Sequence, residues 1–137
     1  HHRRSIYFTI KRSQLVSMMT LFDAPEPNQS NGNRSTTTVA PQALMVMNNP
    51  KVRIAAKAFA KRIMESVSGP DTGIPKAYRI ALGRAPLKEE LAEGIIFVAQ
   101  QEAAYRANGK GEADADELAL ADFCQALLGL NEFIYVD

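Results

Sequence analysis

The sequence predicts a mainly α-helical fold, a compact bundle of five or six helices that also contains one long ordered loop. Apolar residues recur at helical spacing through most of the chain. Clusters of Gly, Pro and Asn divide these periodic stretches into pieces of helix length. Only residues 5–10 and 133–137 are rich in strand-forming side chains. With 137 residues the chain has the length of one domain, and we predict a single domain over residues 1–137.

The N-terminal part is predicted to contain one extended segment and one helix. Residues 5–10, SIYFTI, alternate as a strand does, and residues 133–137, FIYVD, are the obvious partner for a short two-stranded pairing of the chain ends. Ser13 is a suitable N-cap for the helix that follows. We expect this helix to end before Pro25, because residues that precede proline avoid the helical region.

A loop of about eighteen residues, 23–40, comes next, and loops of this length are usually functional or well packed. Pro41 then sets the start of a short helix, since proline favours the first helical position. Residues 51–67 form the clearest helix, because an apolar stripe runs along it at helical period. Opposite this stripe, Arg53, Lys57 and Lys61 are neighbours of like charge, which favours either solvent or an acidic partner beside them.

The later helices are predicted from their start and stop signals. Pro75 is expected to open a helix that Gly83 closes in the left-handed conformation. Pro86 is expected to open the next, in which Gly94 indicates close packing, since a mid-helix glycine otherwise costs about 1 kcal/mol relative to alanine. Asp114 has a glutamate three residues later, which is the spacing of a capping box for the last helix.

Few residues in this chain are of the types that catalyse reactions or bind cofactors. Cys124 is the only cysteine, and its place on an apolar helix face indicates a buried thiol rather than a nucleophile. The two histidines, His1 and His2, are terminal and are assigned no chemistry. The sequence has no C-x-x-C-H haem motif, no phosphate-binding glycine motif and no G-x-S-x-G motif. We therefore assign no catalytic residue, cofactor or metal, and leave open whether the protein is an enzyme.

Charge is distributed unevenly although the net charge is only +1. Residues 1–62 hold ten Lys/Arg and two Asp/Glu, a net charge of +8, whereas residues 63–137 hold six and thirteen, a net charge of −7. Such polarity is typical of a basic surface with an acidic partner, either another part of the same protein or an acidic polymer. Nucleic-acid binding through the basic half is an alternative, but that half offers few aromatic residues for base stacking. No apolar run reaches the roughly 18 residues of a membrane helix.

The long loop supplies the other candidate interaction residues. Polar side chains that are concentrated on a long loop can bind a ligand or contribute to an active site of a larger protein. The alternative is a packed connector that presents one polar surface to another part of the protein. The candidate interaction surface consists of the loop residues, one residue of the following helix and the basic stripe: Asp23, Asn33, Arg34, Thr36, Thr37, Thr38, Gln42, Arg53, Lys57 and Lys61.

Four stretches, in this order, carry a family resemblance: RRSIYFTIKRSQLVSMMTLFDAP, NRSTTTVAPQALMVMNNP, AYRIALGRAPLKEEL and ALLGLNEFIYVD. Together they closely resemble the first planctomycete-specific secreted domain, a domain of unknown function, over residues 3–137. The resemblance implies the C-terminal part of a large exported protein, located in the periplasm or at the cell surface. Any haem would lie in cytochrome-c-like upstream domains, which would also be the natural partners. The family implies no catalytic residues for this domain.

This chain departs from the family pattern at two places. Leu87 and Lys88 stand where the family usually has a Thr-Pro pair, so a capping hydroxyl worth about 1 kcal/mol is missing and we expect the helix to start at Pro86 or to fray. Gly129 and Leu130 replace polar residues in the usual ALLNSNEF, which puts in question only the turn before the terminal segment.

Overall fold

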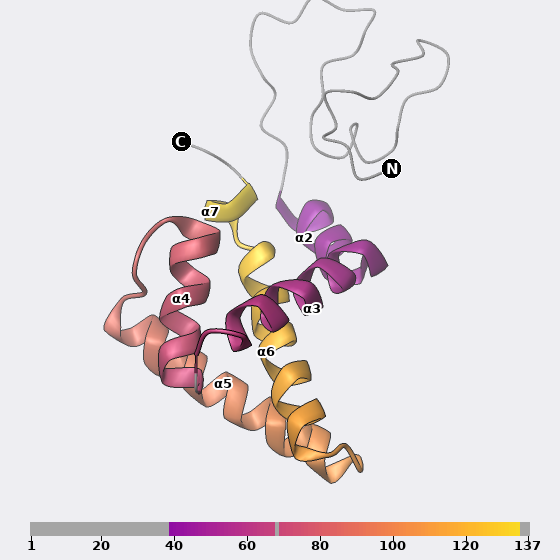
Figure 1. Ribbon diagram of the computed structural model, residues 1–137. Coiled ribbons are helices and arrows are strands. Elements are labelled where there is room, and N and C mark those ends of the chain that lie inside the picture. Colours follow the sequence, from indigo (N-terminus) through magenta and orange to yellow (C-terminus); the bar gives the residue numbers. More distant parts are fainter. Residues whose placement is uncertain (1–38, 68, 135–137) are drawn as a thin grey trace, which may run out of the picture. The chain divides into compact units, whose positions relative to one another are not determined.

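The computed structural model describes residues 39–67 and 69–134 of the chain, and it confirms the predicted helical fold (Figure 1). The described residues form six helices and contain no strand: α2 (Val39–Asn48), α3 (Pro50–Met64), α4 (Pro70–Leu82), α5 (Lys88–Ala107), α6 (Glu112–Leu128) and α7 (Asn131–Ile134). Contacts divide the chain into two units, residues 1–42 and 43–137, and the packing described below is that of the second unit. None of the described helices is long and apolar enough to span a membrane.

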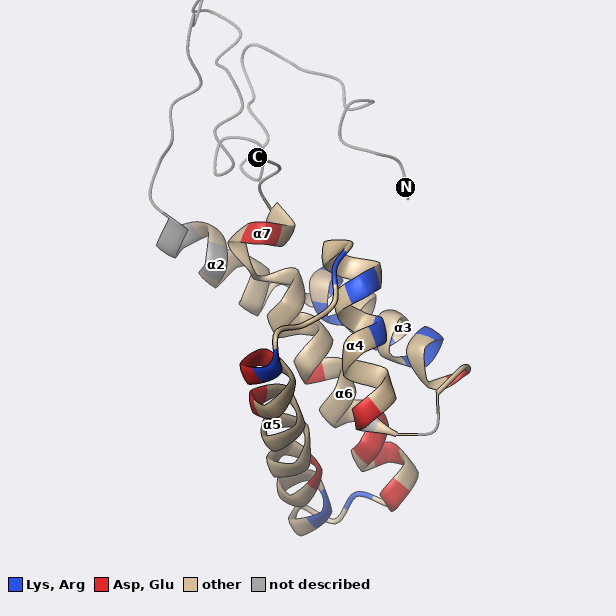
Figure 2. Ribbon diagram, turned by 90° about the vertical axis from the view of Figure 1, so that its left-hand side faces the viewer, with Lys and Arg blue, Asp and Glu red and all other residues tan. Residues whose placement is uncertain are grey.

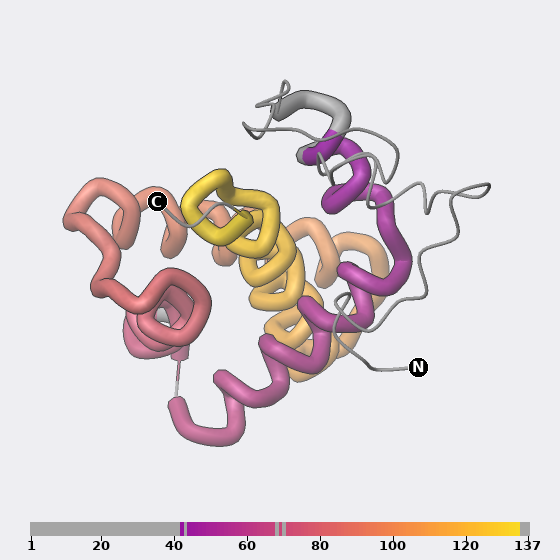
Figure 3. Tube along the Cα trace, turned by 90° about the horizontal axis from the view of Figure 1, so that it is seen from above, coloured from indigo at the N-terminus to yellow at the C-terminus, as the bar shows by residue number. Residues whose placement is uncertain are grey.

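Helix α6 is central in the second unit, because both α3 and α5 pack along it and α4 also contacts it (Figures 1 and 3). Its buried face is the apolar face on which the sequence places Cys124, with Leu120, Phe123, Cys124 and Leu127 all at most 7% exposed. Small residues on α3 and α6, including Ala56 on α3, are fully buried, so the two helices approach closely. The apolar spacing of the sequence therefore places the core along one helix.

Helix α3 begins one residue before the predicted start and ends three residues before the predicted end. The Asn49 side chain accepts a hydrogen bond from the backbone N–H of Lys51 at 2.9 Å, and Pro50 occupies the first turn, where the backbone N–H groups have no helical partner. The helix ends at Met64 rather than at residue 67. The reason is local: both the backbone N–H and the hydroxyl of Ser66 donate to the carbonyl oxygen of Ile63, at 3.1 Å each, and these bonds close the last turn.

Two helix starts differ from the predictions because the prolines do not mark the first residue. Helix α2 begins at Val39, so Pro41 lies in its first turn rather than at its first position. Helix α4 begins at Pro70, five residues before the predicted start, and Pro75 lies inside the helix. The Gly69 carbonyl oxygen accepts from the N–H of Gly73 at 2.9 Å, which starts the helix one turn before Pro75. Pro75 then removes only one helical hydrogen bond.

The later helix boundaries also correct the predictions. Helix α5 begins at Lys88, with Leu87 as N-cap, rather than at Pro86. Helix α6 begins at Glu112, so Asp114 lies inside its first turn and is not the N-cap. Phe133 and Ile134 belong to helix α7, so the predicted extended C-terminal segment is wrong for these two residues. The proposed strand partner, residues 5–10, and the helix expected after Ser13 lie outside the described residues.

Two glycine predictions are confirmed. Gly83 caps α4 in the left-handed conformation, with φ of 73°. Gly94 is buried where α5 meets its neighbours, and a Cβ atom there would lie 3.1 Å from a ring carbon of Phe123 on α6 and 3.3 Å from Ile74 on α4. The absence of a side chain at Gly94 therefore permits the contact among three helices.

Candidate functional site

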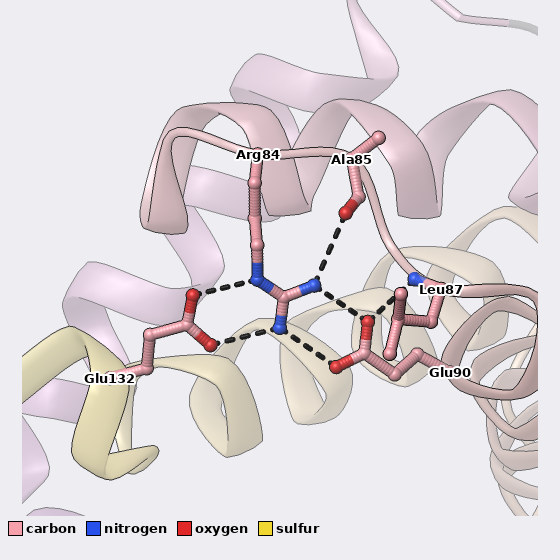
Figure 4. A network of polar contacts seen from close by, with 5 residues as sticks. All are labelled: Arg84, Ala85, Leu87, Glu90 and Glu132. Atoms are coloured by element: carbon pink, nitrogen blue, oxygen red, sulfur yellow. Dashed lines mark hydrogen bonds and ion pairs between the residues drawn. The ribbon is translucent and has the colours of Figure 1, made fainter.

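The most extensive polar cluster in the described chain is centred on Arg84, just after α4 (Figure 4). The guanidinium group donates to both carboxylate oxygens of Glu132 on α7, at 2.7 and 2.8 Å. It also donates to both carboxylate oxygens of Glu90 on α5, at 2.7 and 2.8 Å. Glu90 in turn accepts from the backbone N–H of Leu87 at 2.7 Å, which is the half of a capping box that needs no hydroxyl at the N-cap. One side chain thus joins α4, α5 and α7.

The charges within this Arg84 cluster stabilise one another. Hydrogen bonds from Arg84 and from the Leu87 backbone lower the pKa of Glu90 from 4.5 to about 2, and hydrogen bonds from Arg84 lower the pKa of Glu132. The Arg84 guanidinium also lies 5.3 Å from the centre of the Tyr78 ring, within cation–π range. Burial and the nearby Glu90 charge raise the pKa of Tyr78. The cluster therefore holds its acids ionised and its phenol protonated near neutral pH.

A second polar cluster is centred on Arg53 and joins α3 to α6 and α5. Arg53 forms an ion pair with Asp122, donates to the Gln125 side chain at 3.1 Å and approaches the Tyr105 hydroxyl at 3.4 Å. Tyr105 donates to the other oxygen of Asp122 at 2.9 Å. Burial is the main cause that raises the pKa of Tyr105, and this hydrogen bond raises it further. Gln125 also donates to the backbone carbonyl of Met47 on α2 at 2.7 Å. The basic and acidic halves of the sequence therefore meet at this cluster.

The three residues of the predicted basic stripe have different surroundings, because Arg53 is bound within its cluster and the two lysines are exposed. Arg53 faces inward, with its side chain 28% exposed, because Asp122 and Gln125 on α6 bind it. Lys57 and Lys61 are exposed, and neither forms an ion pair with the described residues. Figure 2 shows basic positions along α3 and α4 and acidic positions on α5 and α6. Residues 50–82 hold seven Lys/Arg and two Asp/Glu, whereas residues 83–134 hold four and ten.

Of the remaining predicted site residues, the structure describes Gln42 and leaves out those of the loop. Asp23, Asn33, Arg34, Thr36, Thr37 and Thr38 lie outside the described residues. Gln42 lies on α2 and is 2% exposed. The loop part of the candidate interaction surface, and its possible contribution to an active site, therefore stays a prediction.

Two clefts lie beside the helices of the second unit. One, of about 430 Å³, is lined mainly by apolar atoms of Met47, Phe97 and Ala126, with Asp122 and Gln125 beside them. The other, of about 160 Å³, lies between α3, α5 and α6 and has Glu102 and Asp116 among its lining residues. Arg106 binds these two carboxylates at 3.8 and 2.9 Å. Within the described residues no three His, Cys, Asp or Glu side chains are grouped to hold a metal ion.

Comparison with models of known protein families identifies the family of this chain. Residues 1–98 match the model of PSD1, a protein of unknown function (DUF1553). The chain belongs to the PSD1 family. No curated protein and no solved structure matches it. Membership in PSD1 confirms the predicted domain of unknown function, while planctomycete origin and export stay predictions.

Sequence reasoning missed both polar clusters of this PSD1 chain. Arg53 and Asp122 are 69 residues apart, and nothing in the spacing of either residue indicates the other. Glu90 did give a signal, since an acidic residue three positions after a helix N-cap is half of a capping box. The prediction placed the helix start at Pro86, so this spacing was not recognised.

Proposed function

We propose that this PSD1 domain is a non-catalytic interaction module of a larger exported protein, and that its partner is the upstream part of the same protein. The proposal rests on one observation, which is that α3 has a paired charge on its inner side and, on its outer side, exposed charges that form no ion pair among the described residues. Arg53 is neutralised inside the domain by Asp122, whereas Lys57 and Lys61 on the outer side remain exposed. Exposed like charges at one-turn spacing destabilise an isolated helix slightly, and an acidic partner would relieve this repulsion.

Cys124 and the charged groups of the two clusters support a structural role. Burial raises the pKa of the Cys124 thiol to about 12, which keeps it protonated and unreactive at neutral pH. Arg84 and Arg53 each bind carboxylates from other helices, so these charges join helices to one another. A catalytic acid or base near neutral pH would instead need a pKa close to 7. The low pKa of Glu90, about 2, fits an ion-pair partner.

Export and the larger protein are supported by the family resemblance of the four sequence stretches. The test is to read the complete gene for a signal peptide and for upstream C-x-x-C-H motifs, and to locate the protein by cell fractionation. We expect a cleavable signal and recovery from the periplasm or the cell surface. A full-length cytoplasmic protein would contradict this part of the proposal.

The interaction role is tested by two measurements on the 137-residue chain. The first is calorimetric titration against the separately purified upstream part of the parent protein, for which we expect saturable binding that weakens as salt is raised. The second is a turnover assay with sulfated and acidic glycans, for which we expect no product. Absence of binding, or turnover by the chain alone, would contradict the proposal.

A further inference from the structure

We infer that the outer face of α3 docks an acidic amphipathic helix of a protein partner, an inference that rests on the proposed interaction role. The α3 docking face is defined by six exposed residues: Lys51, Ile54, Lys57, Ala58, Lys61 and Arg62. Its centre is apolar and its two edges are basic. This arrangement matches an acidic helix that presents apolar residues toward α3 and carboxylates on either side.

The α3 docking face follows from helix geometry and from the exposure of its residues. Successive residues turn by about 100° around an α-helix, so Ile54 and Ala58 lie one turn apart on the same line. Ile54 is 68% exposed, a large apolar side chain on the side opposite the core. By the same rotation, Lys57 and Lys61 border this line on one side, and Lys51 and Arg62 border it on the other.

The opposite side of α3 fixes the docking face in position. Ala56, Ala60 and Ile63 are fully buried in the core, and Arg53 is held by Asp122 on α6. The face is therefore pre-organised on a helix of 15 residues, about 22 Å long, which can pair with about four turns of a second helix.

Charge complementarity identifies the partner as acidic. Among the described residues, Lys51, Lys57, Lys61 and Arg62 form no ion pair. Glu65, the C-cap residue, is the acidic exception on this side of the helix. The N-terminal segment is not the occupant that charge favours, because residues 1–42 hold five Lys/Arg and two Asp/Glu and so are basic as well.

The apolar centre favours an acidic helix over an acidic polymer. Nucleic acids and acidic glycans bind mainly through charge, and single-stranded nucleic acids also stack their bases on aromatic residues. The α3 docking face offers Ile54 and Ala58 and has no aromatic residue. Apolar anchors at i and i+4 with charges on both sides are the arrangement by which helices bind one another.

The test compares three probes by fluorescence anisotropy. They are a synthetic acidic helix with leucines at i and i+4 spacing flanked by glutamates, a heparin hexasaccharide and a 16-base-pair DNA duplex. The variants are Lys57→Glu/Lys61→Glu, Ile54→Gln, and the control Lys88→Glu/Lys110→Glu, which makes the same charge change at two exposed lysines elsewhere. Circular dichroism is used to verify that each variant folds.

We expect the helical probe to bind the wild-type chain and the control equally. The charge-reversal variant and Ile54→Gln should each weaken binding about tenfold or more, since one removes ionic contacts and the other removes apolar burial. Preferred binding of heparin or DNA that is insensitive to Ile54→Gln would overturn the inference in favour of an acidic polymer. Failure of the helical probe to bind at low salt would overturn it as well.

The same variants titrated against the upstream part of the parent protein separate this inference from the proposed function. Weaker binding by Lys57→Glu/Lys61→Glu and by Ile54→Gln, but not by the control, would support the α3 docking face. Equal binding by all variants would overturn the docking face and leave the interaction role intact. No binding by the wild-type chain would overturn the interaction role itself.

Discussion

Gly94 provides the sharpest test of the packing, because two opposite effects act on the substitution Gly94→Ala. Alanine in place of glycine stabilises a helix interior by about 1 kcal/mol. The new Cβ would lie 3.1 Å from Phe123 and 3.3 Å from two atoms of Ile74, and both side chains are buried. Overpacking of this kind costs about 1 to 3 kcal/mol. We expect a net loss of about 1 kcal/mol in the free energy of unfolding, measured by urea denaturation.

Two further variants show whether the clash is the cause. Ala92→Gly, at an exposed position of the same helix, measures the propensity difference alone and should cost about 1 kcal/mol. Ile74→Val removes one of the crowded methyl groups, so Gly94→Ala should cost about 0.5 to 1 kcal/mol less in that background. If Gly94→Ala stabilised the domain by as much as Ala92→Gly destabilises it, Phe123 and Ile74 would not be crowded by the new Cβ.

Three other predictions concern the ionisable groups. Asp122→Ala should lower the free energy of unfolding by about 1 to 3 kcal/mol, because Arg53 loses its charged partner while still partly buried; a change below 0.5 kcal/mol in urea denaturation would contradict this. The pKa of Glu90 is lowered from 4.5 to about 2, so its ionised carboxylate stabilises the fold at pH values above 4.5. This contribution is lost as the pH falls toward 2. Arg84→Gln should therefore flatten the loss of stability between pH 4.5 and 2, and an unchanged acid-unfolding profile would count against the pair. Cys124 should resist alkylation at pH 8 until the protein unfolds, because burial raises its pKa to about 12; rapid labelling of native protein would contradict this.

The helices were predictable because their signals are local. The apolar spacing in residues 51–67 and around Cys124 indicated which faces would be buried, and Gly83 marked the end of α4 through the φ that only glycine adopts easily. Apart from the C-terminal segment, where Phe133 and Ile134 are helical, the errors concerned boundaries where two local signals compete. Pro75 suggested a helix start, but the turn that begins at Gly69 had already started the helix.

The two polar clusters were not predictable because they join residues that are far apart in the chain. Arg53 belongs by sequence to a stripe with Lys57 and Lys61, and its spacing gives it the same expected role. Only the packing of α3 on α6 places Asp122 and Gln125 beside Arg53 and leaves the two lysines outside. On α3, Lys57 and Lys61 are exposed and Arg53 is bound by α6, while the interaction role of these residues stays a prediction.

The helical class, the buried faces, the helix-capping role of Gly83, the close packing at Gly94 and the separation of charge along the chain all follow from the sequence alone. Each of these depends on residues within a few positions of one another, where helical periodicity and backbone preferences act. Which charges are neutralised and which remain exposed follows only from the packing of the helices. That outcome depends on which helices come into contact, since Arg53 and Arg84 bind carboxylates that lie up to 69 residues away.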